Sequence, residues 1–373
     1  MIISKINEEN NSNNNIDEIS SNKTIDIGSQ TIPLSERRFK EIIDNFSLIS
    51  PILVFGDVGL DKYTFGNVSR ISPEAPVAVL EVSKEWYKLG LAANVIDNLR
   101  SLKVPSTLLS VIGDDKNGFE FEKLLRELGL DSTNVLKVKE RVTTLKERVI
   151  TNTQQICRID YENKNELSTA TYDQIVDLVR NASSEHSALI IEDYGKGIVE
   201  EKSLNSIINI FRESGKLITV DPSRSTNPYC YKNAHLLKPN FEEASIMVKA
   251  LGFTREKNLE MMANILVDKL NLDMLVITLG ANGMGLIDKK RDGKFQLIPT
   301  VAKEVFDVSG AGDTAISVIT SSLVAKATLE ESCWIANCAS GIVVAKRGTA
   351  TVSIDELSKF YRELEYEISQ RFQ

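Results

Sequence analysis

Short runs of consecutive apolar residues alternate along this chain with longer stretches in which apolar residues recur every three to four positions. A continuous apolar run is typical of a strand buried on both faces of a parallel sheet, and the longer periodic stretches predict amphipathic helices. The runs lie at 51–57, 107–112, 188–192, 217–221, 235–238 and 274–280. The helical patterns lie at 92–102, 118–128, 172–181, 201–213, 241–250 and 259–270. This alternation predicts a doubly wound α/β sheet that binds ligands at the carboxyl ends of its strands.

Two segments interrupt this alternation. Residues 63–82 and 143–161 alternate apolar and polar side chains, with no helical pattern between the expected strands. Such segments predict a small β sheet that projects from the core and could cover a site as a lid. Three further helices are expected near the C-terminus, at about 311–326, 330–346 and 354–372.

The N-terminal part of the chain has a different composition. Residues 1–33 are polar and rich in asparagine, with no periodic apolar pattern, so we expect a disordered tail. From Leu34 onward, apolar side chains at helical spacing predict a short amphipathic helix (Phe39, Ile42, Ile43, Phe46). We expect residues 34–373 to form a single domain.

Composition narrows the classes of function. The net charge of −8 argues against nucleic acid or an anionic membrane surface as the main partner. Neither a membrane-spanning apolar run nor a secretory signal is apparent, and the four cysteines lack metal-type spacing, so we expect a cytoplasmic protein with reduced thiols. With only two histidines, a histidine zinc site or a Ser-His-Asp triad is disfavoured. Catalysis is therefore expected to depend on carboxylates, lysine and glycine amides, with Mg²⁺ as a candidate metal.

The segment Gly310-Ala311-Gly312-Asp313, just before an expected helix, is the most informative one. Its glycines let several backbone amides point at one place near a helix N-terminus, which suits an anion. A carboxylate such as Asp313 would repel an anion bound at this place, so its presence needs a reason. It has one if Asp313 takes a proton from a nucleophile that attacks the anion, as in phosphoryl transfer to an alcohol. The alternative is a helix-capping aspartate in an ordinary turn. A Walker A loop is excluded, because no Gly-Lys-Ser/Thr follows at the required spacing.

Further motifs follow the expected strands or open the expected helices. They are Gly56-Asp57 with Asp61, Gly90 to Asn94, Asp193 to Gly197, Lys238 to Glu243, and Thr278 to Gly283. Each has a purely structural alternative, and Asn240 with Glu243 matches a capping box. All of them nevertheless fall, with Asp313, at the same end of the predicted sheet.

These motifs resemble the ribokinase-like (PfkB) family of sugar kinases over roughly residues 48–358, and within it most closely the D-glycero-β-D-manno-heptose 7-phosphate kinases. The more specific likenesses are Val68 to Val77, Asp193 to Gly197, Asp307 to Thr314 and Gly348 to Ser353. The resemblance implies a three-layer α/β/α sandwich with a mostly parallel central sheet and a small projecting β lid. It also implies ATP and Mg²⁺ as cofactors, and a homodimer that pairs through the lid.

The resemblance implies roles for particular residues as well. Asp313 would be the general base, and the amides of Gly310, Ala311 and Gly312 would stabilise the transferring phosphoryl group. Asp61, Gly90 and Asn94 would bind the sugar, and Lys196 a phosphate on it. Asn240 and Glu243, with Phe241 and Glu242 between them, would organise Mg²⁺ through water and the ATP phosphates, and Thr278, Gly280 and Gly283 would line the nucleotide side. Lys146, Arg148 and Arg158 are weaker phosphate candidates, for which solvated surface charge is the preferred interpretation.

Two positions depart from the family pattern: Leu91 and Gly59 stand where the family has glycine and methionine. Both are expected beside the sugar, so a kinase for another sugar, sugar phosphate or nucleoside is an alternative. A non-catalytic sugar or nucleotide sensor is a third, which the presence of Asp313, Asn240 and Glu243 disfavours. Bifunctional relatives carry a nucleotidyltransferase domain, and we expect no such activity because neither histidine belongs to a His-x-Gly-His motif.

Overall fold

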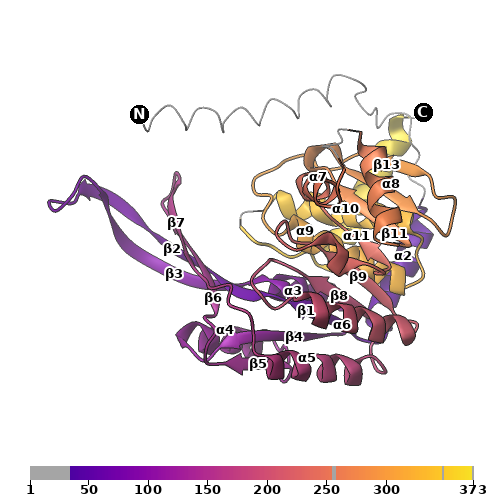
Figure 1. Cartoon of the computed structure of the whole chain (residues 1–373). Helices are drawn as coiled ribbons and strands as arrows, with labels where there is room; N and C mark the ends of the chain where they lie inside the picture. The colour runs from indigo at the N-terminus through magenta and orange to yellow at the C-terminus, as the bar shows by residue number, and fades with distance from the viewer. Residues whose placement is uncertain (1–33, 254–257, 347, 372–373) are drawn as a thin grey trace.

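The computed structural model describes residues 34–253, 258–346 and 348–371, so the predicted N-terminal tail lies outside the described part. A nine-stranded sheet runs through the molecule in the order β13-β12-β11-β10-β9-β8-β1-β4-β5 (Figure 1). Its strands are β1 Ile52–Gly56, β4 Ser106–Gly113, β5 Val135–Val138, β8 Ala188–Glu192, β9 Leu217–Asp221, β10 Leu236–Leu237, β11 Met274–Thr278, β12 Met284–Asp288 and β13 Phe295–Ile298. All neighbouring pairs are parallel except β11 with β12 and β12 with β13.

The six apolar runs of the sequence all form strands of this sheet. β10 is shorter than its run, and β11 ends at Thr278, before the 3₁₀ turn η5 at Gly280–Asn282. Three strands were not predicted: β5, β12 and β13. β5 and β13 have only four residues each and are partly exposed, and β12 contains Gly285, so none of them carries the long apolar run of a central strand.

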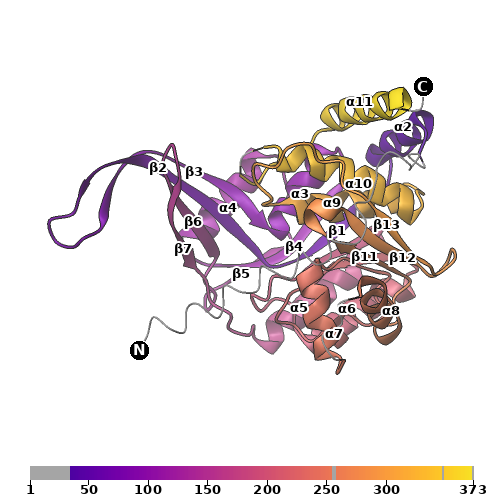
Figure 2. The ribbon, with the colours of Figure 1, turned by 90° about the horizontal axis from the view of Figure 1, so that it is seen from above.

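Helices cover both faces of the sheet (Figure 2). Successive β1 side chains enter different cores: Ile52 and Val54 join one cluster, and Leu53 and Phe55 join the other, as expected for a strand buried on both faces. The first cluster holds side chains of α2 Glu36–Asp44, α3 Ala92–Ser101, α4 Lys116–Glu127, α9 Ala311–Val324, α10 Leu329–Val344 and α11 Ile354–Arg371. The second holds those of α5 Thr169–Ala182, α6 Glu201–Glu213, α7 Phe241–Ala250 and α8 Leu259–Lys269. The α/β/α sandwich predicted from the sequence is thereby confirmed.

A second sheet of four strands projects from the body (Figure 1). Its order is β3-β2-β6-β7, with β2 Val58–Ile71, β3 Ala78–Leu91, β6 Thr144–Ile150 and β7 Gln155–Tyr161. β2 starts two residues after β1 ends, and β3 runs directly into α3. The base of the projecting sheet therefore lies at the carboxyl end of β1. Among the described helices, none combines the length and the apolar character that crossing a membrane requires.

Candidate active site

A cavity of about 810 Å³ opens where several strands of the central sheet end. β8, β9 and β11 supply its lining from the sheet side through Glu192, Asp221 and Thr278, and α9 supplies Asp313. The predicted site residues that line it are Asn240, Glu243, Thr278, Gly280, Gly283, Ala311, Gly312 and Asp313. A volume of this size suits a ligand as large as a nucleotide.

The N-terminus of α9 is shaped by a glycine. Gly310 is the N-cap residue with φ of 81°, in the left-handed region that favours glycine, and no side chain caps the helix there. A Cβ on Gly310 would lie 2.9 Å from Asn94 Nδ2, so a larger residue would displace the asparagine. The Ala311 amide donates to Val308 O at 3.3 Å. The amides of Gly312 and Asp313 lie in the same turn, whose N–H groups have no acceptor within the helix.

Asp313 is nearly buried, and both of its carboxylate oxygens accept hydrogen bonds. Tyr194 Oη donates to Oδ1 at 2.7 Å, and Asn94 Nδ2 donates to Oδ2 at 2.6 Å. Burial raises the pKa of Asp313, although these two donors and the nearby Lys238 oppose the rise. Its carboxylate thus bonds to side chains from other elements, and the simple capping alternative does not account for its position.

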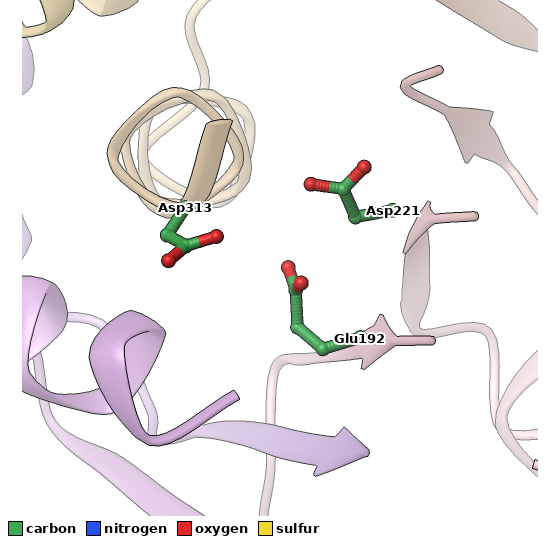
Figure 3. Close-up of side chains that lie close together, drawn as sticks. All are labelled: Glu192, Asp221 and Asp313. Atoms are coloured by element: carbon green, nitrogen blue, oxygen red, sulfur yellow. The ribbon is translucent and has the colours of Figure 1, made fainter. Parts of the chain in front are cut away.

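Two more carboxylates converge on Asp313 (Figure 3). One oxygen each from Glu192, Asp221 and Asp313 lies within 4.8 Å of the others. Both Glu192 oxygens are buried and have no hydrogen-bond partner among the described residues, and burial together with Asp221 raises the pKa of Glu192 well above its ordinary value. Asp221 lies 2.7 Å from Lys238 Nζ, and burial raises the pKa of Asp221 to about 7 despite this lysine.

The sequence predicts no role for Glu192, Asp221 or Lys238, although Lys238 begins the Lys238 to Glu243 motif. Each is the last residue of a predicted apolar run, at 188–192, 217–221 and 235–238. A charged residue that ends a buried strand was therefore the signal that could have found them, because the carboxyl ends of parallel strands meet at one edge.

Asn240 and Glu243 form the capping box that the sequence left as an alternative. The Glu243 amide donates to Asn240 Oδ1 at 2.9 Å, and the Asn240 amide donates to Glu243 Oε2 at 2.8 Å. Both side chains still line the cavity, so the two interpretations are compatible. Phe241 packs against the second core cluster, and Glu242 is exposed and pairs with Arg224 at 2.9 Å, and neither lines the cavity.

The predicted sugar-binding residues lie next to Asp313 but do not line this cavity. Asp61, on β2, accepts hydrogen bonds from Arg148 Nη1 at 2.5 Å and from Thr349 Oγ1 at 3.2 Å. A Cβ on Gly90 would lie 3.1 Å from Asp61 Oδ2, so glycine leaves the carboxylate uncrowded. Together with Asn94, which donates to Asp313, these residues form a polar group at the base of the projecting sheet.

Basic side chains lie around Asp61, Gly90 and Asn94. For two of them, the prediction of solvated surface charge was wrong. Lys146 and Arg148 are not solvated surface charges: Arg148 pairs with Asp61, and burial lowers the pKa of Lys146, which also lies near Asp61. Arg158 is exposed and pairs with Asp160, as expected of surface charge. Lys196 Nζ donates to Glu162 and is not part of the cavity lining.

The loop that carries Tyr194 and Lys196 is fixed by a buried carboxylate. Asp57 accepts the backbone amides of Tyr194, Lys196 and Ile198 at 3.1, 3.0 and 3.2 Å, and Arg141 Nη2 lies 3.4 Å from it. Burial raises the pKa of Asp57, although these backbone hydrogen bonds and Arg141 act to lower it. The Gly56-Asp57 motif therefore positions the loop that brings Tyr194 to Asp313.

The two departures from the family pattern have structural consequences. Leu91 has φ of 60° at the start of α3, in the left-handed region that favours glycine. A Cβ on Gly59 would lie 2.8 Å from Thr144 O, so a methionine here would require β2 and β6 to separate. Leu91 thus stores backbone strain, and Gly59 permits a closer approach of two strands of the projecting sheet.

Comparison with known proteins agrees with this geometry. A family model described as pfkB family carbohydrate kinase matches residues 58–356. The chain belongs to the pfkB family of carbohydrate kinases. It is therefore a phosphotransferase that acts on an alcohol group, and the family predicted from the sequence motifs is confirmed.

Curated relatives are bifunctional proteins. The chain is similar to the bifunctional protein HldE of Sulfurimonas denitrificans, with 39% identity over 313 residues, which are 84% of this chain and 64% of that protein. Identity to HldE of Citrifermentans bemidjiense is 41% over 306 residues, or 82% and 62% of the two chains. The match thus spans less than two thirds of the length of these relatives.

Solved structures show the same fold. Escherichia coli phosphofructokinase-2 in complex with substrates and products aligns with a TM-score of 0.70 and 21% identity, over 85% of this chain and 99% of that chain. Arabidopsis thaliana ribokinase complexed with ribose and ATP aligns with a TM-score of 0.63 and 18% identity, over 84% and 98%. The ribokinase-like fold of this pfkB kinase is confirmed.

Proposed function

We propose that this chain transfers the γ-phosphoryl group of ATP to the anomeric hydroxyl of D-glycero-β-D-manno-heptose 7-phosphate, giving the 1,7-bisphosphate used to make ADP-heptose for the lipopolysaccharide core. The observation that carries this proposal is the position of Asp313. Its carboxylate lies between a nucleotide-sized cavity and the polar group of Asp61 and Asn94. The likeness to HldE proteins supports the choice of a heptose. A cytoplasmic location follows from this role.

Asp313 acts as the general base in the proposed reaction. It removes the proton from the anomeric hydroxyl while the oxygen of that hydroxyl attacks the γ-phosphorus. Such a base contributes about 10²–10⁴-fold to the rate. The amides at the start of α9, with the positive end of the helix dipole, stabilise the negative charge on the transferring group. The loss of one donor of this kind costs roughly 3 kcal/mol.

The acidic cluster fits a divalent cation, for which we propose Mg²⁺. Glu192 offers two buried oxygens without partners, and Asp221 offers a third carboxylate oxygen within 4.8 Å. Carboxylate oxygens are the ligands that Mg²⁺ prefers, and in kinases the ion neutralises charge on the phosphates. We propose Glu192 and Asp221 as direct ligands, with Asn240 and Glu243 acting through water. The adenine side of the nucleotide lies along Thr278, Gly280 and Gly283.

The acceptor sugar is proposed to bind on the side of Asp61, Gly90 and Asn94. Lys196 binds its phosphate, and Lys146 and Arg148 add positive charge around the same group, because both lie close to Asp61. Without substrate, Lys196 Nζ donates a hydrogen bond to Glu162. When the sugar phosphate binds, Lys196 leaves Glu162 and donates to the phosphate instead.

A second acceptor class is favoured by one observation. Leu91 holds a strained conformation at the position where the family has a glycine against the sugar. A different sugar, sugar phosphate or nucleoside would explain why the residue departs from the pattern. The non-catalytic sensor is disfavoured, because the chain has Asp313, the residue that we propose as the base, together with Asn240 and Glu243.

An assay of phosphoryl transfer across a panel of acceptors tests the proposal. The panel contains heptose 7-phosphate, unphosphorylated heptose, fructose 6-phosphate, fructose, ribose and adenosine. We expect kcat/KM to be highest for the heptose 7-phosphate, with product phosphorylated at the anomeric carbon. A higher value for another acceptor would replace the heptose, and no transfer to any acceptor would contradict a kinase function.

A further inference from the structure

Lys238 ends the apolar run that forms β10 and lines the cavity beside the first turn of α9. Its side chain is 3% exposed, and Nζ lies 2.7 Å from Asp221 Oδ2. A buried ammonium group loses its hydration, which lowers its pKa, but the paired Asp221 together with Glu192 and Glu243 more than offsets this loss and raises the pKa of Lys238. Lys238 is therefore held in its charged form at the edge of the cavity, where the charge is available to a bound anion.

The ammonium group faces the helix N-terminus that would hold the phosphates. A Cβ built on Gly312 would lie 3.6 Å from Lys238 Nζ and 3.7 Å from Asp221 Oδ2. The group thus lies across a short gap from the first turn of α9. Lys238 also lowers the pKa of Asp313 through its charge, which places the cation near the proposed base.

The hydrogen-bonding capacity of Lys238 is not used up. An ammonium group carries three donors, and among the described residues Asp221 is the acceptor found for it. Lys164 and Arg224 also line the cavity, but Lys164 is exposed and Arg224 pairs with Glu242 and Glu243. Lys238 is the buried cation among these three.

We propose that Lys238 is a catalytic residue that contacts an oxygen of the γ-phosphoryl group during transfer and that Asp221 positions its ammonium group. This inference rests on the proposed kinase function. The bond between the γ-phosphorus and the β–γ bridging oxygen breaks, and its electron pair leaves with ADP. A new bond forms from the acceptor oxygen to the γ-phosphorus, and the acceptor proton passes to Asp313. Lys238 keeps its protons and stabilises charge on the transferring oxygens.

The variant Lys238→Met tests this role, with Lys249→Met on the exposed end of α7 as the matched control. Turnover is measured at saturating acceptor, and affinities for ADP and for the β,γ-imido analogue of ATP are measured by calorimetry with Mg²⁺. We expect kcat to fall about 100-fold, on the order of losing one transition-state donor. The affinity for the imido analogue should fall at least tenfold, and that for ADP less than threefold. The control should match the wild type.

Three results would overturn this inference, and a fourth would overturn the proposed kinase function on which it rests. A folded Lys238→Met enzyme with kcat within threefold of wild type would show that the lysine does not act in transfer. An equal loss of affinity for ADP and the analogue would show a general structural role. If Lys238→Met does not melt cooperatively, Lys238→Arg is used instead, because arginine keeps a positive charge beside Asp221 but places it differently. Unchanged turnover of Lys238→Arg would also refute the proposed contact with the γ-phosphoryl group. A wild type that transfers phosphate to no acceptor would instead refute the kinase proposal.

Discussion

The hydroxyl of Tyr194 donates a hydrogen bond to Asp313 Oδ1 at 2.7 Å. Tyr194 itself is held in place by its backbone amide, which donates to Asp57 Oδ2 at 3.1 Å. The bond stabilises the ionised form of Asp313 and so opposes the effect of burial on its pKa. Tyr194 therefore sets how readily the proposed base takes up a proton.

Tyr194→Phe should move the acidic limb of the pH–rate profile to higher pH. The reaction requires ionised Asp313, whose pKa is already raised by burial, and loss of the tyrosine donor raises it further. The limb is located by measuring kcat/KM from pH 5 to 9 in constant Mg²⁺. Tyr229→Phe, an exposed tyrosine, is the control and should leave the profile unchanged. A shift of the limb to lower pH would contradict the role of Tyr194.

Asp313→Asn should lower kcat at least about 100-fold, on the order expected for loss of a general base. Folding should persist, because asparagine has a similar shape and the substitution removes a buried ionisable group. The measurements are kcat, the melting temperature and ATP affinity, with Asp355→Asn on the exposed first turn of α11 as control. If the variant retained most of its activity, Asp313 would be a helix-capping residue and not the general base.

Glu192→Gln should distinguish the effect of Glu192 on metal binding from its effect on the stability of the fold. The folded protein holds a proton on Glu192 more tightly than the unfolded chain, so this group makes stability fall as pH rises. In metal-free buffer the variant should therefore melt no lower than wild type, with its advantage larger at pH 8 than at pH 5.

Addition of MgCl₂ with ATP should raise the melting temperature of wild type more than that of Glu192→Gln, because a ligand that binds the folded state stabilises it. Glu213→Gln, exposed at the end of α6, is the control. Equal stabilisation of both proteins by the metal would remove Glu192 from the ligand set.

Lys196→Ala should raise KM for a phosphorylated sugar far more than for its unphosphorylated analogue. The ammonium group contributes to binding only where it faces an anion. The exposed Arg158→Ala is the control, since Arg158 pairs with Asp160 at the surface. Equal effects of Lys196→Ala on both substrates would show that Lys196 does not contact the sugar phosphate.

The projecting sheet should pair two copies of the chain. It leaves apolar side chains exposed, which a monomer seldom does over a wide area (Val68, Ile71, Val77, Val82, Ile156, Ile159). Light scattering at micromolar concentration should give about twice the 41.5 kDa chain mass. Val79→Asp should shift this mass toward the monomer. A monomeric wild type would refute the assembly, and a dimeric Val79→Asp would place its interface elsewhere.

The sequence alone was sufficient for features that depend on neighbouring residues. Apolar runs became central strands because burial on both faces requires continuous apolar side chains, and the runs at 188–192 and 217–221 matched β8 and β9 residue for residue. The turn of Gly310 and the capping box of Asn240 with Glu243 are also local, since each concerns residues within one helical turn.

The tertiary structure decided which charges meet. Tyr194 is 119 residues from Asp313 and Asn94 is 219 residues from it, so no periodicity could reveal that both bond to the same carboxylate. Arg148 seemed to be a surface charge because its strand has polar neighbours, and pairing of β6 with β2 brings it to Asp61. The burial that raises the pKa of Glu192 and Asp221 likewise arises only when the strand ends and α9 close around them, because desolvation depends on the packing of distant segments.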